Sequence, residues 1–335
     1  MQYNKNNSSS IRLSEIGFGA WGIGGKTLGP TSYDDIQHKT AIDALNLALD
    51  NGITYYDTSN VYGDGESEKR ISDAFSTIRE EVVLGTKAGL VSYDSKPQFD
   101  VKSLELSIHS SLSRLKTDYI DILFLHNITT ADIIDADELI TFIEKLKSDG
   151  KIRALGLSLP NLGSTKYLID LFHPNFLQFN FNMMDWRVVD EGYLDYCDSK
   201  GCSIIARTPL AAGFLTGDIT SKTTFSSSDH RSRYGKALIQ KILEFRQELS
   251  FSLSINSSNL YEYAIRFCLS FDNIVTVIPG ILTPQQAVNN ALISNLGPLS
   301  KSEILLIREV YDKYSNDISL LINTDVKDLN LGNNK

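Results

Sequence analysis

The chain has few cysteines and histidines, and none is spaced for a metal site. Its 335 residues include three cysteines, Cys197, Cys202 and Cys268. An odd number without paired spacing argues against both a disulfide framework and a zinc site. The five histidines form neither an H-x-x-H nor an H-E-x-x-H pattern. We therefore expect no catalytic metal and read the cysteines as reduced packing residues.

Long apolar runs and basic clusters are also missing. No apolar segment approaches the roughly 20 residues that a membrane-spanning helix needs. Lys and Arg number 32 against 41 Asp and Glu, which gives a net charge of −9. A nucleic-acid-binding chain would need a cationic surface instead. We expect a cytoplasmic protein whose partners include neither membrane nor nucleic acid.

The two ends of the chain differ in composition from the middle. Residues 1–10, "MQYNKNNSSS", have no hydrophobic segment and predict a disordered lead-in rather than a signal peptide. Residues 319–335 predict a polar, frayed tail. Between them, residues 11–318 predict one domain, because barrel folds of this length commonly form a single unit.

Strand-like and helical patterns alternate through this domain. Strands are expected near 15–21, 52–59, 81–88, 118–127, 151–158, 175–182, 201–208 and 273–280, each followed by a helical stretch. Nearly continuous apolar strands covered by amphipathic helices are typical of a buried parallel sheet. Eight such units favour a single closed (β/α)8 TIM barrel. No G-x-G-x-x-G follows the first strand, which disfavours an open dinucleotide-binding sheet.

Two segments depart from the alternation. Residues 213–258 are rich in Ser and Thr and enclose the helical run "KALIQKILEFRQEL". Long loops in compact domains are usually functional lids or disordered, and the sequence leaves the role of this one open. Residues 300–314 predict an extra C-terminal helix that packs outside or beneath the barrel.

Four residues with complementary chemistry stand near the ends of three successive expected strands. They are Asp57, Tyr62, Lys87 and His126. In a TIM barrel, the carboxyl ends of the strands form the active-site mouth, so these side chains should meet there. A lysine beside a tyrosine favours the phenolate, and a carboxylate orients the lysine. Each residue alone could equally be an ordinary packing or surface residue.

The motifs that carry these residues are "YYDTSNVYGDGESE", "VVLGTKAG" and "YIDILFLHN". In this order they resemble the Asp-Tyr-Lys-His tetrad of the aldo-keto reductases. The similarity extends from "EIGFGAWGIGG" at 15–25 to "VIPGILTPQQAVNNA" at 277–291. It implies NAD(P)H-dependent reduction of an aldehyde or ketone, with Tyr62 as proton donor. Lys87 and Asp57 would then tune Tyr62, and His126 would orient the carbonyl.

The resemblance also implies where cofactor and substrate bind. Side chains cannot deliver hydride, so a nicotinamide must supply it. The implied cofactor contacts are Gly19, Ala20 and Trp21 beside the nicotinamide, Ser158 and Gln178 at its carboxamide, Arg207 stacked on its ring, Thr208, Pro209, Leu210, Gly213 and Gly217 around the pyrophosphate, and Gly280, Gln286 and Asn290 towards the adenosine. Trp21, Tyr93 and Trp186, with segment 213–258, would line a pocket for a small carbonyl compound or a sugar.

Two departures from the family pattern affect the cofactor. The family usually has Ser-Asn where this chain has Ser158 and Leu159. The stretch that matches the 2′-phosphate site also lacks Lys and Arg, since none occurs between Arg266 and Lys301. A phosphate dianion without a local cation binds poorly. NADP(H) is thus the family expectation and NAD(H) a serious competitor, unless Arg231 or Arg233 supplies the charge.

Other functions fit parts of this pattern. One is a non-catalytic regulatory protein that senses nicotinamide on the same fold. Another is a Schiff-base aldolase that uses Lys87, although this needs an amine of depressed pKa and Asp57 opposes that. The sequence leaves open the physiological substrate, the favoured direction and the oligomeric state.

Overall fold

The computed structural model describes residues 1–5, 9–26, 33 and 35–328. Its strands are β1 (Tyr3–Lys5), β2 (Arg12–Ser14), β3 (Phe18–Gly19), β4 (Tyr55–Asp57), β5 (Val83–Ala88), β6 (Ile120–His126), β7 (Ile152–Ser158), β8 (Phe176–Asn180), β9 (Ser203–Arg207) and β10 (Ile274–Ile278). Its α-helices are α1 (His38–Asp50), α2 (Glu66–Phe75), α3 (Val101–Leu115), α4 (Ala136–Ser148), α5 (Thr165–Phe172), α6 (Arg187–Asp190), α7 (Tyr193–Ser199), α8 (Lys236–Ser252), α9 (Leu260–Cys268), α10 (Pro284–Ile293) and α11 (Lys301–Asp328).

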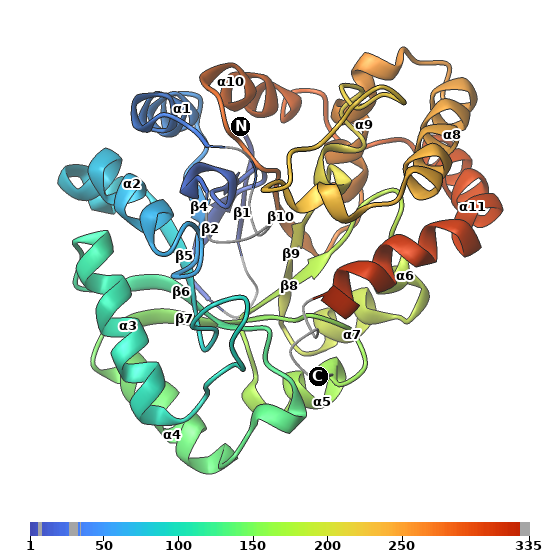
Figure 1. The fold of residues 1–335 in the computed structure, drawn as a ribbon. Helices are drawn as coiled ribbons and strands as arrows, with labels where there is room; N and C mark the ends of the chain where they lie inside the picture. Colours follow the sequence, from blue (N-terminus) through green and yellow to red (C-terminus); the bar gives the residue numbers. More distant parts are fainter. Residues whose placement is uncertain (6–8, 27–32, 34, 329–335) are drawn as a thin grey trace.

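Strands β3 to β10 form one parallel sheet of eight strands in sequence order. The sheet closes into a barrel where its first strand, β3, meets its last strand, β10. Gly17 N donates to Val277 O at 2.8 Å, and Gly19 N donates to Pro279 O at 2.9 Å. Helices surround the strands in Figure 1. The TIM barrel that the sequence predicts is therefore confirmed.

The strands and helices follow from the distribution of apolar residues. All seven residues of β6 are buried, as expected for a strand covered on both faces. In α4 the buried residues Leu139, Phe142, Ile143 and Leu146 recur at helical spacing. The outer helices thus pack one apolar face against the barrel and leave the other face to solvent.

Large side chains fill the inside of the barrel beneath the mouth. Tyr55 and Phe124 are fully buried within an interior cluster. Two glycines make room for them. A Cβ at Gly85 would lie 2.6 Å from the Tyr55 hydroxyl, and one at Gly156 would lie 2.3 Å from the Phe124 ring. The inside of the barrel is therefore a packed core that lies beneath the residues at the mouth.

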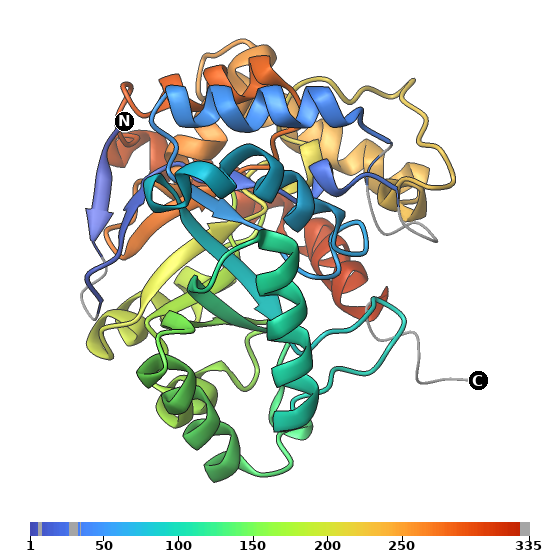
Figure 2. The ribbon, with the colours of Figure 1, turned by 90° about the vertical axis from the view of Figure 1, so that its left-hand side faces the viewer.

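The expected disordered lead-in is wrong for residues 1–5. β1 pairs antiparallel with β2, and this hairpin lies at one end of the barrel in Figure 2. Leu13 of β2 has no exposed surface and joins the interior cluster. Gln2 N donates to Ser294 Oγ at 3.0 Å. The hairpin thus closes the barrel at the opposite end from the strand termini that carry the site; residues 6–8 lie outside the described part of the chain.

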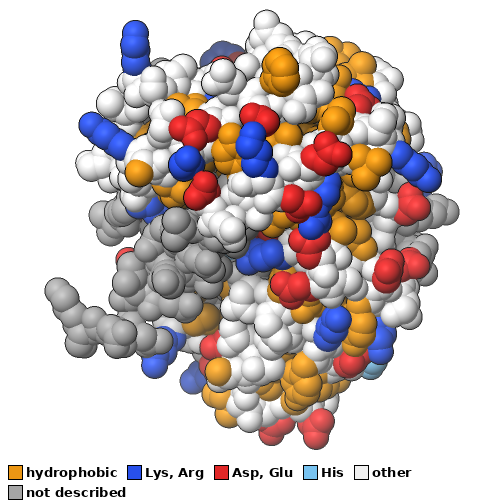
Figure 3. All heavy atoms as spheres, turned by 90° about the vertical axis from the view of Figure 1, so that its right-hand side faces the viewer, with side chains coloured by type: hydrophobic (Ala, Val, Ile, Leu, Met, Phe, Trp, Pro, Cys, Tyr) orange, Lys and Arg blue, Asp and Glu red, His pale blue; other side chains and the backbone are white. Residues whose placement is uncertain are grey.

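The C-terminal third adds two long helices to the barrel. Segment 213–258 contains α8, and α11 packs against it. Lys313 of α11 donates to Glu248 of α8 at 2.8 Å. On this side of the molecule acidic and basic side chains are interspersed (Figure 3). α11 continues to Asp328, past the predicted start of a frayed tail at 319, and residues 329–335 lie outside the described part. None of the described helices is long and apolar enough to span a bilayer.

Candidate active site

Six polar side chains lie at or near the carboxyl ends of successive strands. They are Asp57 of β4, Lys87 of β5, His126 of β6, Ser158 of β7, Gln178 of β8 and Arg207 of β9. The register places His126 opposite Ser158 and Ser158 opposite Gln178. Because parallel strands end at one edge of the barrel, these groups converge at its mouth.

Lys87 is the centre of the site and is 1 % exposed. Its Nζ donates to Asp57 Oδ1 at 2.6 Å, to Thr58 O at 2.8 Å and to Tyr62 Oη at 3.1 Å. An ammonium group has three N–H donors, so each of them has an acceptor. Since the Tyr62 oxygen accepts from Lys87, the phenolic proton is left to point elsewhere.

Asp57 is held by more than Lys87. Its second carboxylate oxygen accepts hydrogen bonds from Gln178 Nε2 and, at 3.3 Å, from the Tyr55 hydroxyl. The side chain is 3 % exposed. A buried carboxylate with several donors keeps one geometry, and here it fixes the position of the Lys87 ammonium.

Tyr62 lies in the Tyr62 turn (residues 60–65) between β4 and α2. Glycines let this turn pack against the loop after β3. Gly63 has φ +61°, and a Cβ there would lie 2.0 Å from Gly24 O. Tyr62 N donates to Ser59 O at 3.1 Å, and Ser67 N donates to Tyr62 O at 3.2 Å. Backbone contacts thus bring the Tyr62 side chain over the ends of β4 and β5.

The electrostatics of Tyr62 differ from the sequence-based expectation. Burial raises the pKa of Tyr62, Asp57 raises it further, and Arg207 lowers it. The sequence predicts that Lys87 favours the phenolate. The pairing with Asp57 at 2.6 Å offsets the lysine charge, so burial decides the direction. Burial also lowers the pKa of Lys87 itself, against the pull of Asp57.

His126 is buried beside Tyr62 and stays neutral. Its Nδ1 lies 3.2 Å from Ser59 Oγ, and its ring meets the Tyr62 ring edge-on at 6.4 Å between centroids. Burial lowers the pKa of His126 well below its usual value, and Lys87 and Arg207 add to this. The site therefore holds a protonated phenol and a neutral imidazole next to a paired ammonium group.

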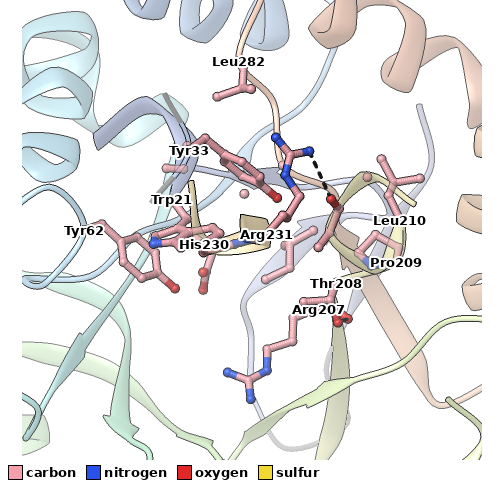
Figure 4. Close-up of a pocket in the computed structure, with 18 of the residues that line it drawn as sticks. Trp21, Tyr33, Tyr62, Arg207, Thr208, Pro209, Leu210, His230, Arg231 and Leu282 are labelled. Carbon is pink, nitrogen blue, oxygen red and sulfur yellow. Dashed lines mark hydrogen bonds between the residues drawn. The ribbon is translucent and has the colours of Figure 1, made fainter. Parts of the chain in front are cut away.

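A cavity of about 1000 Å³ opens over these residues. Tyr62 and His126 line it, and so do Trp21, Tyr33 and Tyr93. Figure 4 shows Tyr62, Trp21 and His230 near one another, with Thr208, Pro209 and Leu210 on a different side of the cavity. The Trp21 and His230 rings stack at 4.8 Å. A cleft that combines aromatic faces with polar and charged side chains is suited to an organic ligand.

The cavity brings together most of the predicted cofactor contacts. Those that line it are Gly19, Ala20, Trp21, Gln178, Arg207, Thr208, Pro209, Leu210, Gly213, Gly280 and Gln286. Three others do not line it. Ser158 is fully buried and accepts from Arg207 Nη1 at 3.3 Å. Asn290 is 4 % exposed on α10, and Gly217 packs close to Ser257 O.

Two observations show that these residues fit a nicotinamide dinucleotide. Gln178 donates to Asp57, while its Oε1 has no hydrogen-bond partner among the described residues. An amide donor from the ligand would satisfy this buried acceptor. The loop after β9 contains Thr208, Ala211 and Ala212 at positive φ. Such strained backbone is found at ligand sites, where it can turn successive N–H groups towards an anion.

Leu159 stands where the family usually has Asn. Its side chain is 3 % exposed and makes no polar contact. Its carbonyl oxygen accepts from Arg207 Nη2 at 2.8 Å. At this position the chain therefore holds the Arg207 guanidinium through the backbone.

The prediction that Trp186 lines the substrate pocket is wrong. Trp186 is 3 % exposed and lies in the core, with its ring 4.9 Å from that of Phe267. Its Nε1 donates to Met183 O at 3.1 Å. The tight turn between Asn182 and Asp185 directs the chain after β8 away from the cavity. Tyr93 does line the cavity.

The sequence analysis missed several residues of the cavity. Asn127 lines it at φ +59°, and its Oδ1 has no partner among the described residues. Its place directly after His126 was a signal that it could be used. Tyr33 belongs to no recognisable motif, and tertiary packing brings its ring to 4.9 Å from that of Trp21. His230 lies in segment 213–258, which was expected to line the pocket, but the sequence did not single it out. Within the described ranges, no group of three or more His, Cys, Asp or Glu side chains could hold a metal ion.

Comparisons with known proteins show which family the chain belongs to. The aldo/keto reductase family model matches residues 15–312. The NADH-specific methylglyoxal reductase of Escherichia coli is 26 % identical over 90 % of this chain and 96 % of its own length. The L-galactose dehydrogenase of Arabidopsis thaliana is 32 % identical over 62 % of this chain and 65 % of its own length.

A solved structure shows the same fold. The holo form of an aldo-keto reductase from Bacillus halodurans superposes with a TM-score of 0.75 at 24 % identity, covering 92 % of this chain and 96 % of the other. At that identity the likeness concerns the fold alone. The family match spans the barrel and the strand ends that carry the site. The chain belongs to the aldo/keto reductase family and is an NAD(P)-dependent oxidoreductase.

Proposed function

We propose that this protein reduces a small aldehyde or ketone to an alcohol, with Tyr62 as the proton donor. The observation that carries the proposal is the triple hydrogen bonding of Lys87 to Asp57, Thr58 and Tyr62 at 2.6, 2.8 and 3.1 Å. It leaves the Tyr62 proton available at the edge of a cavity that His126 also lines.

The bound nicotinamide would supply hydride to the carbonyl carbon. As negative charge develops on the carbonyl oxygen, Tyr62 donates its proton to that oxygen. Lys87 already donates to the Tyr62 oxygen, so it stabilises the phenolate that remains. Asp57 keeps the ammonium in place, and a proton from water restores the phenol.

His126 orients the substrate as a neutral group. When Ser59 donates to Nδ1, the imidazole carries its proton on Nε2 and can donate it to the carbonyl oxygen. Two donors, Tyr62 and His126, would then fix this oxygen. A substrate and cofactor that fill the cavity would displace water from it, which strengthens both hydrogen bonds.

The aromatic part of the cavity wall favours a substrate with a C–H or apolar surface. Trp21, Tyr33 and Tyr93 offer aromatic faces, against which the C–H surface of a sugar or a short carbon chain can pack. The names of the two sequence relatives point to the same range, a small dicarbonyl and a sugar. We therefore propose a small or sugar-like carbonyl compound.

We also propose that the protein uses NADH about as well as NADPH. Gly280 and Gln286 line the cavity where the family resemblance places the adenosine, and neither is a cation. The Gln286 Oε1 accepts from Leu282 N at 2.8 Å, so this amide caps α10. Arg231 is engaged by Asp229 at 2.6 Å, which offsets its charge.

The proposed function is tested by mixing the purified protein with NADH or NADPH and a panel of small aldehydes, ketones and aldoses. Carbonyl-dependent loss of the reduced-nicotinamide absorbance is expected with at least one member. The protein could instead bind the cofactor tightly, seen as quenching of tryptophan fluorescence, and turn over no carbonyl compound. This result would contradict the proposed enzymatic function. That outcome would favour a nicotinamide-sensing regulatory protein.

A further inference from the structure

Glu68 is a fully buried carboxylate that the mechanism above does not use. It lies on α2 with none of its surface exposed. Thr86 Oγ1 donates to its Oε1 at 2.6 Å, and Arg114 Nε donates to its Oε2 at 2.6 Å. A charge taken this far from water is costly unless it is paired and hydrogen-bonded. The two contacts meet that condition, and they join three separate elements.

The elements that Glu68 joins are those that carry the proton donor and its lysine. α2 begins at Glu66, directly after the Tyr62 turn. Thr86 precedes Lys87 on β5 and, by the alternation of a strand, faces the helices while Lys87 faces the site. Arg114 lies in the last turn of α3. The Glu68 carboxylate therefore connects α2, the helix after Tyr62, to β5, the strand that contains Lys87.

The neighbouring residue reinforces this link. Ser67 Oγ lies 2.8 Å from Thr58 Oγ1 and donates to Ala20 O at 2.8 Å. Thr58 O is one of the three acceptors of Lys87. Arg114 also packs against the Tyr62 turn, because a Cβ on Gly65 would lie 2.6 Å from its side chain. The start of α2 is thus attached to the Tyr62 turn through Arg114 and to Thr58, an acceptor of Lys87, through Ser67.

We propose that Glu68 is a positioning residue that, through Thr86 and Arg114, holds Tyr62 Oη and Lys87 Nζ at the separation needed for proton donation. The inference rests on the proposed function. Tyr62 sits on a turn and Lys87 on a strand, so a rigid link between them sets their distance. A displacement of about 1 Å in such an arrangement can cost about a hundredfold in rate.

Thr86→Val is the sharpest test, because valine keeps the size and branching of threonine and removes only the hydroxyl. We expect kcat to fall at least about tenfold. The Kd for the cofactor and the KM for the carbonyl should change by less than about twofold, since neither ligand touches Thr86. Thr86→Ser restores the donor and should recover most of kcat.

Glu68→Gln provides a second variant in case valine disturbs the strand. It keeps an acceptor for Thr86 but weakens the contact to Arg114, so we expect a smaller loss of kcat. Asp121→Asn is the matched control. Asp121 is also a fully buried carboxylate paired with two arginines, Arg79 at 2.7 Å and Arg153 at 2.6 Å, but it lies near the start of β6, away from the mouth.

The control separates positioning from stability. Asp121→Asn should lower the melting temperature and leave the kcat of the folded protein unchanged. Thr86→Val and Asp121→Asn could instead lower the melting temperature equally and both leave kcat unchanged. This result would overturn the positioning role of Glu68. So would a kcat loss in Thr86→Val that Thr86→Ser does not recover. Absence of carbonyl reduction in the wild type would instead overturn the proposed function, and this inference with it.

Discussion

The ionisable residues of the site are sorted by burial and pairing. Burial raises the pKa of Tyr62 and lowers that of His126, so both favour their neutral forms. Lys87 keeps an anionic partner at 2.6 Å. A neutral donor can release its proton to a developing alkoxide, whereas an ionised phenol could not. The charge state of each residue thus suits reduction of a carbonyl.

Lys87→Met tests the role of the ammonium group. The thioether keeps much of the volume of the side chain but donates no hydrogen bond, so the phenolate formed after proton transfer loses its partner. We expect kcat to fall by about 10² or more, with cofactor affinity little changed. Steady-state kinetics and a fluorescence titration measure both quantities. Near wild-type kcat in Lys87→Met would contradict this role.

At the residue level, the sequence predicted the identity of the site better than its electrostatics. Motif order was enough to bring Asp57, Tyr62, Lys87 and His126 together, because strand ends of a barrel converge. The pKa of Tyr62 is raised by burial first and by Asp57 second, and no motif gives the burial of a side chain. Trp186 failed as a pocket residue because a tight turn directs it into the core.

At the level of elements, local patterns predicted the eight parallel strands but not the N-terminal hairpin. β1 is three residues long, too short to show a periodic pattern. Its support comes from distant residues, since Asn4 Nδ2 donates to Val275 O at 2.9 Å. The same limit applies to the short 3-10 helix that begins at His230, because His230 stacks on Trp21, a residue far away in the sequence.

We expect the loops around the cavity to decide the cofactor preference. We expect the dissociation constants for NADPH and NADH to lie within about tenfold, or about 1.4 kcal/mol, because no Lys or Arg occurs between Arg266 and Lys301. A phosphate held by two charge-assisted hydrogen bonds would give a larger difference. Fluorescence titrations of the wild type with both cofactors measure this ratio.

Arg231 and Arg233 are the cations that could change this result, since both line the cavity. Arg231 Nε donates to Asp229 at 2.9 Å, and Arg231 Nη1 donates to Ala212 O at 3.4 Å. Figure 4 shows Arg231 beside Tyr33. A strong NADPH preference that disappears in Arg231→Ala or Arg233→Ala would assign the phosphate to that arginine. A preference that survives both changes would mean that the phosphate binds elsewhere.

For the molecule as a whole, buried histidines link stability to pH. Burial lowers the pKa of His230 to about 4, with Arg233 adding to this, and it lowers that of His126 as well. Below the unfolded pKa of about 6.5 the unfolded chain binds protons that the native state does not. The stability from neutral His230 is therefore present above pH 6.5 and is lost as pH falls towards 4.

His230→Phe tests this linkage, because phenylalanine can keep the stack on Trp21 without titrating. Urea unfolding between about pH 6.5 and pH 4 should show a shallower loss of stability in the variant. The difference in slope should be up to about 1.4 kcal/mol per pH unit, the value for one proton. Parallel curves for the variant and the wild type would show that His230 does not contribute to the acid sensitivity.

Alternation predicted the closed barrel, because eight successive strand–helix units favour closure of a parallel sheet over an open sheet. The full lining of the cavity needed the folded chain, because Tyr33 and Asn127 line it although neither was identified from the sequence. The central claim of the proposed mechanism is that Tyr62 gives its proton to the substrate.

The most direct test of that claim is the single-turnover rate of Tyr62→Phe loaded with reduced cofactor and mixed with a carbonyl substrate of the wild type. Phenylalanine keeps the ring and removes the proton donor, so the rate should fall by about 10² to 10⁴, while cofactor affinity stays within about twofold. Tyr93→Phe, which removes another phenol from the same cavity, should retain most of the rate. A Tyr62→Phe rate within about tenfold of the wild type would contradict the mechanism.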